Sequence, residues 1–166
     1  MSSGDVYIRV ELERDELDLN RAASILSSLT SGRGAGSLVV FTGFVKGVVD
    51  GRRVFRLSYE AYEDLAVKVL EKIAREEASE RGVYAVWIRH RLGDLKPGEP
   101  TLYVLVVAEP RSLAFRKASR ILDRIKREVP IYKLESRDDG EYWILGESTR
   151  LKREVEAGTV DPQRQR

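Results

Sequence analysis

The sequence of 166 residues predicts an α+β fold, and two kinds of pattern support this prediction. Segments in which apolar and polar residues alternate, as in half-buried strands, are mixed with segments whose apolar residues recur every three or four positions, as on one face of a helix. Asp-Gly pairs at 50–51 and 139–140 stand between neighbouring strand-like segments and signal β-hairpins. Because hairpins join antiparallel strands, this order favours α+β over a repeating βαβ arrangement.

Alternating apolar residues predict the strands. The first is expected over 5–12, where every second residue from position 6 is apolar. We interpret 37–60 as a hairpin-like pair, because the turn signal at 50–51 divides it. The glycine-rich segment 31–36 is interpreted as a linker and not as a phosphate loop, since a strand follows it. Further strands are expected over 83–92, 101–109, 131–137 and 142–147.

Three segments carry the apolar repeat of a helix. The first is 18–30, where Asp18 is a suitable N-cap residue. The clearest repeat covers 61–82, and a third covers 110–129 before Pro130 stops it. With no repeats and no interdomain linker, we expect a single domain over 5–147. A flexible N-terminus is expected over 1–4, and a partly disordered C-terminal tail over 148–166.

Composition excludes several function classes. The chain has no cysteine and one histidine, which excludes disulfides, thiolate nucleophiles, iron–sulfur clusters, cysteine zinc sites and multi-histidine metal sites. The formal net charge of +2 argues against a protein that coats nucleic acid through bulk charge. No stretch approaches the ~18 apolar residues of a membrane span, and no signal peptide is recognisable. We therefore expect a soluble, cytoplasmic protein without a metal or cofactor.

The most unusual local feature is residues 111–133, where eight Lys and Arg residues accompany two acidic residues. The helical repeat predicts that Lys126 lies at the border of the buried stripe. It also predicts that Arg111 faces inward at the helix start, where free N–H groups attract anions. The residues predicted to be buried on this helix are Phe115, Ala118, Leu122, Ile125 and Val129.

Two lysines of this segment can converge. Lys133 follows Lys126 by seven positions, beyond the corner at Pro130. Cations that share a cleft favour a neutral amine, which serves as a base or nucleophile, whereas a cluster that stays charged binds phosphate or carboxylate. The sequence leaves both readings open, together with the simpler one of a solvated helix face. His90, the single histidine, is either a base or a structural residue of its strand, and Trp87 and Trp143 are predicted to be core residues.

A succession of motifs resembles a known family. In order along the chain, the motifs are FTGFVKG (41–47), LSYEAYEDLA (57–66), RHRLGDLKPGE (89–99), PRSLAFRKASRILDRIKREVPIYKLE (110–135) and DGEYWILGE (139–147). Together, over about 5–147, they resemble the large, catalytic subunit of molybdopterin synthase, the MoaE family.

The resemblance implies a fold and a reaction. The fold would be an α/β hammerhead with an added antiparallel β subdomain. The reaction would convert a pterin phosphate, precursor Z, to molybdopterin by installing two dithiolene sulfurs. The sulfur donor would be the thiocarboxylate on the C-terminal Gly-Gly of a small ubiquitin-like subunit, in a heterotetramer built on a homodimer of large subunits.

The resemblance also implies roles for particular residues. Lys126 and Lys133 would be catalytic, and Arg111 would bind the anionic substrate. Phe41 and Lys46 would border the pocket. Glu135 would act on Lys133 through its negative charge.

Two departures from the family pattern leave alternatives open. Pro110 stands where the family usually has histidine, and Lys46 stands where it usually has arginine. An inactive paralogue that only binds the small subunit is one alternative. A non-catalytic basic module for RNA or an acidic protein is another, although few aromatic residues accompany the basic cluster.

Overall fold

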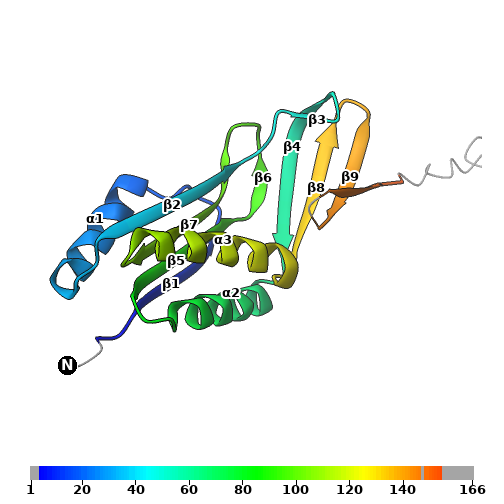
Figure 1. The fold of residues 1–166 in the computed structure, drawn as a ribbon. Helices are drawn as coiled ribbons and strands as arrows, with labels where there is room; N and C mark the ends of the chain where they lie inside the picture. The colour runs from blue at the N-terminus through cyan, green and yellow to red at the C-terminus, as the bar shows by residue number, and fades with distance from the viewer. Residues whose placement is uncertain (1–3, 147, 155–166) are drawn as a thin grey trace, which may run out of the picture.

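The computed structural model describes residues 4–146 and 148–154, which are organised around two β-sheets (Figure 1). In spatial order, the first sheet consists of β1 (Tyr7–Glu13), β5 (Val83–Arg91), β7 (Pro100–Ala108) and β2 (Ser37–Phe44). The second consists of β10 (Thr149–Lys152), β9 (Gly140–Leu145), β8 (Ile131–Arg137), β4 (Arg52–Ala61) and β3 (Val48–Val49), with β6 (Gly93–Leu95) also paired to β4. Only the β1–β5 pair is parallel among these described strands, so the predicted α+β class is confirmed.

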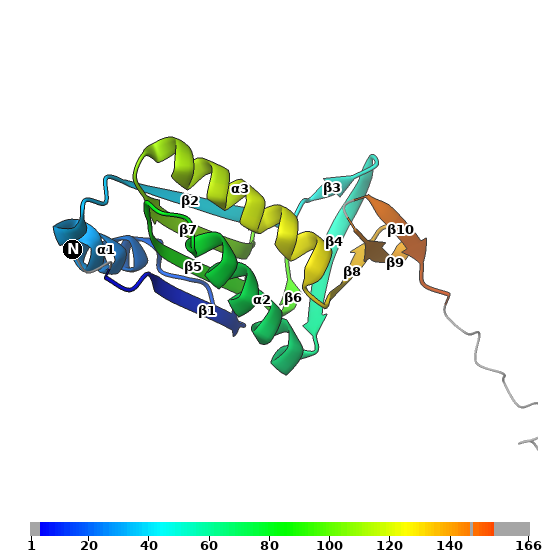
Figure 2. The same ribbon diagram turned by 60° about the horizontal axis from the view of Figure 1, so that its bottom comes forward.

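Helices cover both faces of the first sheet (Figure 2). Helices α2 (Glu63–Ala78) and α3 (Arg111–Glu128) pack on one face, and α1 (Leu19–Thr30), which continues into the 3₁₀ turn η1 (Ser31–Arg33), packs on the other. Successive residues of a strand point to opposite faces. On β5, Val86 and Ile88 therefore join the core under α2 and α3, whereas Ala85 and Trp87 join the core under α1.

The helices lie close to their predicted positions. The Asp18 carboxylate accepts a hydrogen bond from the Arg21 backbone N–H at 3.0 Å and caps α1, as predicted. Helix α2 is shorter than the predicted 61–82, because Tyr62 and Ser79 cap it and Gly82, with φ 98°, forms the turn into β5. None of the helices in the described ranges combines the length and apolar character needed to cross a bilayer.

The prediction that 37–60 forms one hairpin-like pair is wrong. Strand β2 pairs with β7 in the first sheet, whereas β4 pairs with β8 in the second. The turn at Asp50 and Gly51, both with positive φ, joins β4 only to the two residues of β3. Residues 45–47 carry the chain from one sheet to the other.

The C-terminal part contains one strand more than expected. The hairpin of β8 and β9 across Asp138 and Asp139 confirms the second turn signal. Strand β10 falls within the predicted tail of 148–166, yet it pairs along its length with β9. The rest of that tail from residue 155, and residues 1–3 of the predicted flexible N-terminus, lie outside the described residues.

The buried face of α3 differs from the predicted one. Phe115 is 62% exposed and Arg111 points to solvent, whereas Ile121 is fully buried. The observed stripe also includes Lys117, which was not among the residues predicted to be buried. Lys117 is buried because the carboxylate of Glu77 on α2 lies 3.0 Å from its ammonium nitrogen.

Candidate active site

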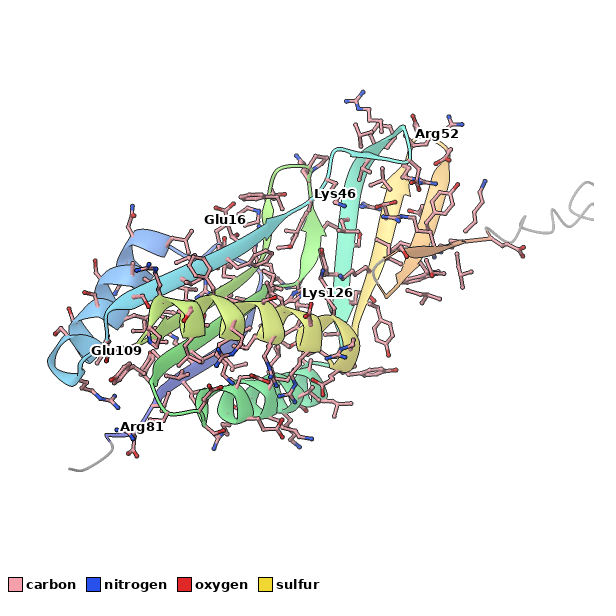
Figure 3. All side chains as sticks on the ribbon, in the orientation of Figure 1. Glu16, Lys46, Arg52, Arg81, Glu109 and Lys126 are labelled. Carbon is pink, nitrogen blue, oxygen red and sulfur yellow. The ribbon has the colours of Figure 1, made fainter. Side chains whose placement is uncertain are left out.

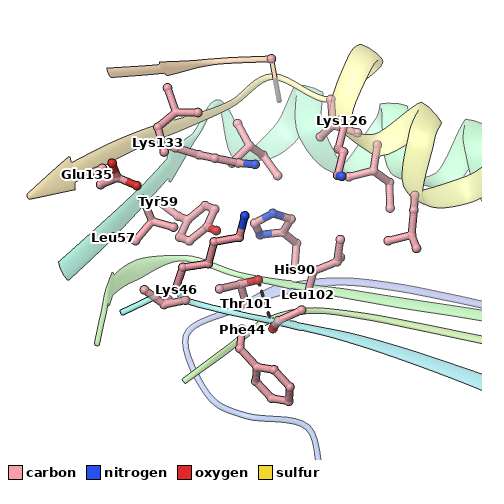
Figure 4. Close-up of a pocket in the computed structure, with 18 of the residues that line it drawn as sticks. Phe44, Lys46, Leu57, Tyr59, His90, Thr101, Leu102, Lys126, Lys133 and Glu135 are labelled. Atoms are coloured by element: carbon pink, nitrogen blue, oxygen red, sulfur yellow. Dashed lines mark hydrogen bonds between the residues drawn. The ribbon is translucent and has the colours of Figure 1, made fainter. Parts of the chain in front are cut away.

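A cavity of about 500 Å³ opens where the C-terminal end of α3 meets the second sheet. This volume is within the range of small-molecule sites, about 300–1,000 Å³. Figure 4 shows that Lys126 on α3 and Lys133 on β8 both reach toward this space. The polar and aromatic residues that line it include Phe41, Phe44, Lys46, Tyr59, His90, Thr101, Asp123, Lys126, Lys133, Glu135 and Arg150.

The strand register builds one wall of the cavity. Lys133 on β8 is paired with Tyr59 on β4 and with Ile144 on β9, and Ile144 is paired in turn with Arg150 on β10. Residues paired across neighbouring strands point to the same face of a sheet, as do positions i and i+2 of one strand. Glu135 therefore shares this face, and all five side chains line the cavity.

The two predicted catalytic lysines are brought to one cavity. Lys126 lies in the last turn of α3, where the helix dipole favours a cation. Pro130 ends the helix and directs the chain into β8, which places Lys133 on the opposite side of the opening. The Lys133 ammonium nitrogen lies 5.7 Å from the centre of the Tyr59 ring, within the range of a cation–π contact.

His90 lies in the cavity wall as a neutral ring. It is 4% exposed, and its Nδ1–H donates to the Arg91 carbonyl oxygen at 2.7 Å. Burial, and to a lesser extent the positive charge of Lys133, lower the pKa of His90 to about 4. A group with so low a pKa is a weak base at pH 7, which favours the structural reading of this histidine.

Tyr59 stays protonated beside His90, with 5.1 Å between the two ring centres. Burial raises the pKa of Tyr59 to about 12, and the negative charge of Glu135 adds to this effect, whereas a hydrogen bond with Thr101 opposes it. The wall therefore presents a phenol and a neutral imidazole near neutral pH. Its charge comes from the lysines, Glu135 and Arg150.

Sequence comparison decides which family this fold and cavity belong to. A family model for the MoaE protein matches residues 12–128, which is more than half of the chain. The chain belongs to the MoaE family. Family membership makes it a molybdopterin synthase catalytic subunit, an enzyme of molybdenum cofactor biosynthesis, as the motifs predicted.

Individual MoaE relatives agree with this assignment. The molybdopterin synthase catalytic subunit of Pyrococcus abyssi is 37% identical over 84% of this chain and 93% of its own length. The crystal structure of molybdopterin synthase from Staphylococcus aureus matches with a TM-score of 0.72 and 30% identity, over 81% of this chain and 95% of that one.

A third relative is alike in fold alone, with 20% identity and a TM-score of 0.65, over 85% of this chain and 92% of its own. It belongs to the protein–protein complex of subunits 1 and 2 of molybdopterin-converting factor from Helicobacter pylori.

Arg111 is the predicted site residue that the MoaE fold does not bring to the cavity. It begins α3, fifteen positions before Lys126. That separation is about 22 Å at a rise of about 1.5 Å per residue. Glu109, just before α3, and Lys126 mark the two ends of this helix in Figure 3. The other predicted residues, Phe41, Lys46 and Glu135, all line the cavity.

The basic cluster of α3 is largely paired within the molecule. The cations that face α2 are Arg116, Lys117, Arg120 and Arg124; their partners are Glu76 and Glu77 on that helix and Glu80 just beyond its end. This pairing neutralises four of the eight cations on which a basic RNA-binding module would depend. Among the described residues, no cluster of His, Cys, Asp and Glu side chains is suited to hold a metal ion.

Five of the lining residues named above were missed in the sequence analysis: Phe44, Tyr59, Thr101, Asp123 and Arg150. Phe44 and Thr101 lie on strands whose predicted positions were close, but the pairing of β2 with β7, which places them, was not foreseen. Arg150 fell within the predicted tail of 148–166, and the segment 148–154 around it has a single apolar residue, Leu151. Its pairing with β9 could be found only from the register of the whole sheet.

Proposed function

We propose that the cavity converts precursor Z, a cyclic pyranopterin monophosphate, to molybdopterin in the cytoplasm. The sulfur comes from the C-terminal thiocarboxylate of a small ubiquitin-like subunit. The observation that carries this proposal is the convergence of Lys126 and Lys133 in one cavity. Phosphate and thiocarboxylate are both anions, and they suit a lining with more cations than carboxylates. Because the partner carries the sulfur, the absence of cysteine does not prevent this chemistry.

The two lysines have the central roles. Lys126 and Lys133 activate or orient the sulfur donor and the pterin from opposite sides of the cavity. Lys46 adds a third cation from the loop after β2, where an ammonium contacts an anion as a point charge and not as a two-pronged fork. Phe41 borders the opening, and Glu135 acts on Lys133 through its charge from two positions along β8.

The sulfur donor enters as an extended tail. A Gly-Gly terminus has no side chains, so it can pass through a narrow opening and place its thiocarboxylate beside the lysines. The two-subunit complex of the Helicobacter pylori relative supports an assembly with a small subunit. No separate cofactor is required, since the pterin is the substrate.

Arg111 binds substrate only if two copies of the chain associate. In one copy it lies about 22 Å along α3 from Lys126 and is exposed. A homodimer that sets the start of α3 against the cavity of the second copy would let Arg111 contact the substrate there. Sedimentation at micromolar concentration that showed only a monomer would contradict this arrangement.

A single-turnover assay tests the function. The chain is mixed with precursor Z and a thiocarboxylated small subunit, and both the dithiolene product and the mass of the small subunit are followed. We expect product to form as the small subunit loses its sulfur. A stable complex that makes no product would indicate an inactive paralogue and contradict the proposal.

Lys126→Ala tests the site within the same assay. We expect the rate to fall by about a hundredfold or more, because an activating charge at the reacting group is lost. Arg127→Ala is the matched control: it is the next residue of the same turn, it is exposed, and it does not line the cavity. Normal turnover by Lys126→Ala would refute the role of that lysine.

A further inference from the structure

The last described strand, β10, supplies a cation to the pocket. Arg150 lies in the row of paired residues that runs from Tyr59 through Lys133 and Ile144, so its side chain points to the pocket face of the sheet. The cavity lining and the strand register are independent observations, and each places Arg150 at the site. The family match ends at residue 128, so it does not reach this strand.

Arg150 is held by Glu135 in a two-point ion pair. The Nε atom of Arg150 lies 3.0 Å from Glu135 Oε1, and its Nη2 atom lies 3.3 Å from Oε2. The carboxylate is only 3% exposed. Arg137 also approaches it, at 3.8 Å, but that guanidinium is bound more closely by Asp139 at 3.0 Å. Arg150 is therefore the main neutralising partner of Glu135.

This pairing matters because of what stands beside Glu135. Lys133 is two positions away on β8 and faces the same cavity. A buried carboxylate without its arginine would attract the lysine ammonium and favour its charged form. It would also repel an incoming phosphate or thiocarboxylate. Among the described residues, the other ionisable groups that line the cavity are Lys46, Tyr59, His90, Asp123 and Lys126.

We propose that Arg150 is a positioning residue of the site. By holding Glu135 in a two-point ion pair, it keeps that carboxylate from capturing Lys133 and keeps the pocket wall attractive to the anionic substrate. The proposal rests on the proposed function for the identity of the substrate. It adds that β10, the strand after the β8–β9 hairpin, contributes to the function of the pocket.

The test measures single-turnover rates against precursor Z concentration, so that the half-saturating concentration and the maximal rate are separated. For Arg150→Ala we expect the half-saturating concentration to rise by about tenfold, the size of a typical coupling between contacting charged groups. Adding Glu135→Gln removes the uncompensated charge, so the double variant should recover most of that loss. Arg150→Lys keeps the charge but cannot make the two-point contact, so its half-saturating concentration should lie between those of the original chain and Arg150→Ala.

Arg153→Ala is the matched control. Arg153 directly follows β10 and pairs with Glu141 at 3.2 Å, but it does not line the cavity. The proposal is overturned if Arg150→Ala behaves like Arg153→Ala. It is also overturned if Glu135→Gln does not relieve the defect, since Arg150 would then act on the substrate directly. If Arg150→Ala fails to fold, the same test uses Arg150→Lys and the double variant. Each of them is then compared with Glu135→Gln alone.

A second measurement separates this inference from the proposed function. Calorimetric titration of the full chain with inorganic phosphate reports on the pocket without any turnover. If the unaltered chain makes no molybdopterin, the proposed function fails. The inference about Arg150 still stands if Arg150→Ala weakens phosphate binding and Glu135→Gln restores it. Equal phosphate binding by the unaltered chain and Arg150→Ala overturns the inference.

Discussion

The α2–α3 interface and the wall of the pocket each bury a carboxylate against cations, but their surroundings differ. Glu77 lies between two helices, with Lys117 at 3.0 Å and Arg120 at 3.2 Å. Glu135 is also paired with a cation, since Arg150 contacts it at two points. Unlike Glu77, Glu135 faces a cavity of about 500 Å³. Both carboxylates are 3% exposed, so burial alone does not distinguish them.

The two regions differ in charge balance. At the helix interface, each cation that faces α2 meets a carboxylate within salt-bridge distance, and the network is closed. At the pocket, the described lining residues include four cations, Lys46, Lys126, Lys133 and Arg150, and two carboxylates, Asp123 and Glu135. A balanced buried network is costly to break, whereas an excess of cations around an open cavity binds anions.

Replacing one lysine in each region should give the largest contrast. Lys133→Ala should lower the single-turnover rate by about a hundredfold or more, with little change in the melting temperature. Lys117→Ala should do the reverse, because it leaves Glu77 buried with fewer partners, far from the cavity. Equal losses of rate in the two variants, measured well below their melting temperatures, would remove the distinction between the regions.

Glu77→Gln should show what the helix network contributes to stability. Removing one partner of a buried ion pair costs about 3 kcal/mol, because the remaining charges stay buried without compensation. Unfolding in guanidinium chloride at pH 7 measures this loss. The maximal rate of the folded variant at 25 °C should stay within about twofold of the original. A loss of less than about 1 kcal/mol would show that the network is not a major source of stability.

The two regions should also respond to acid in different pH windows. The ion pair with Lys117 helps hold the pKa of Glu77 below its ordinary value of 4.5 in spite of burial. The stability it contributes is therefore present in full above pH 4.5 and is lost as the pH falls through the folded value. Burial lowers the pKa of His90 from 6.5 to about 4. Unfolded chains then bind more protons between these values, and stability falls as the pH drops through that range.

Free energies of unfolding measured from pH 7.5 to 3 check both windows. Glu77→Gln should flatten the acid limb below pH 4.5, and His90→Gln should flatten the segment between 6.5 and 4. If either variant keeps the original pH dependence, the corresponding group is not responsible for it.

The exposed ion pair of Arg153 and Glu141 should have the smallest effect on the free energy of unfolding. It gives a baseline for the two buried regions. Arg153 and Glu141 lie 3.2 Å apart, but the arginine side chain is about half exposed. Surface pairs of this kind contribute about 0–1 kcal/mol. Arg153→Ala should therefore change the free energy of unfolding by no more than about 0.5 kcal/mol, and urea unfolding measures this. A larger loss would show that the sheet edge depends on this contact.

Local signals in the sequence predicted most of the elements and the two central lysines. The apolar repeat located α3, Pro130 located its end, and Lys133 followed at a fixed spacing. Features that depend on distant partners were not predictable in this way. Lys117 is buried because of Glu77, forty positions earlier, and Arg150 reaches Glu135 across the intervening β9 strand. β2 and β4 joined different sheets because their partners, β7 and β8, come much later in the chain.

The position of the second sheet in the chain has a consequence for synthesis on the ribosome. Every strand of the first sheet and all three described helices precede residue 129, so the large apolar core can form before β8 has emerged from the ribosome. Until then, the edge of β4 that later binds β8 has no partner, and an open strand edge invites pairing with other chains. The pocket wall forms later, when Arg150 emerges and meets Glu135. The nascent chain therefore gains its core before its active site.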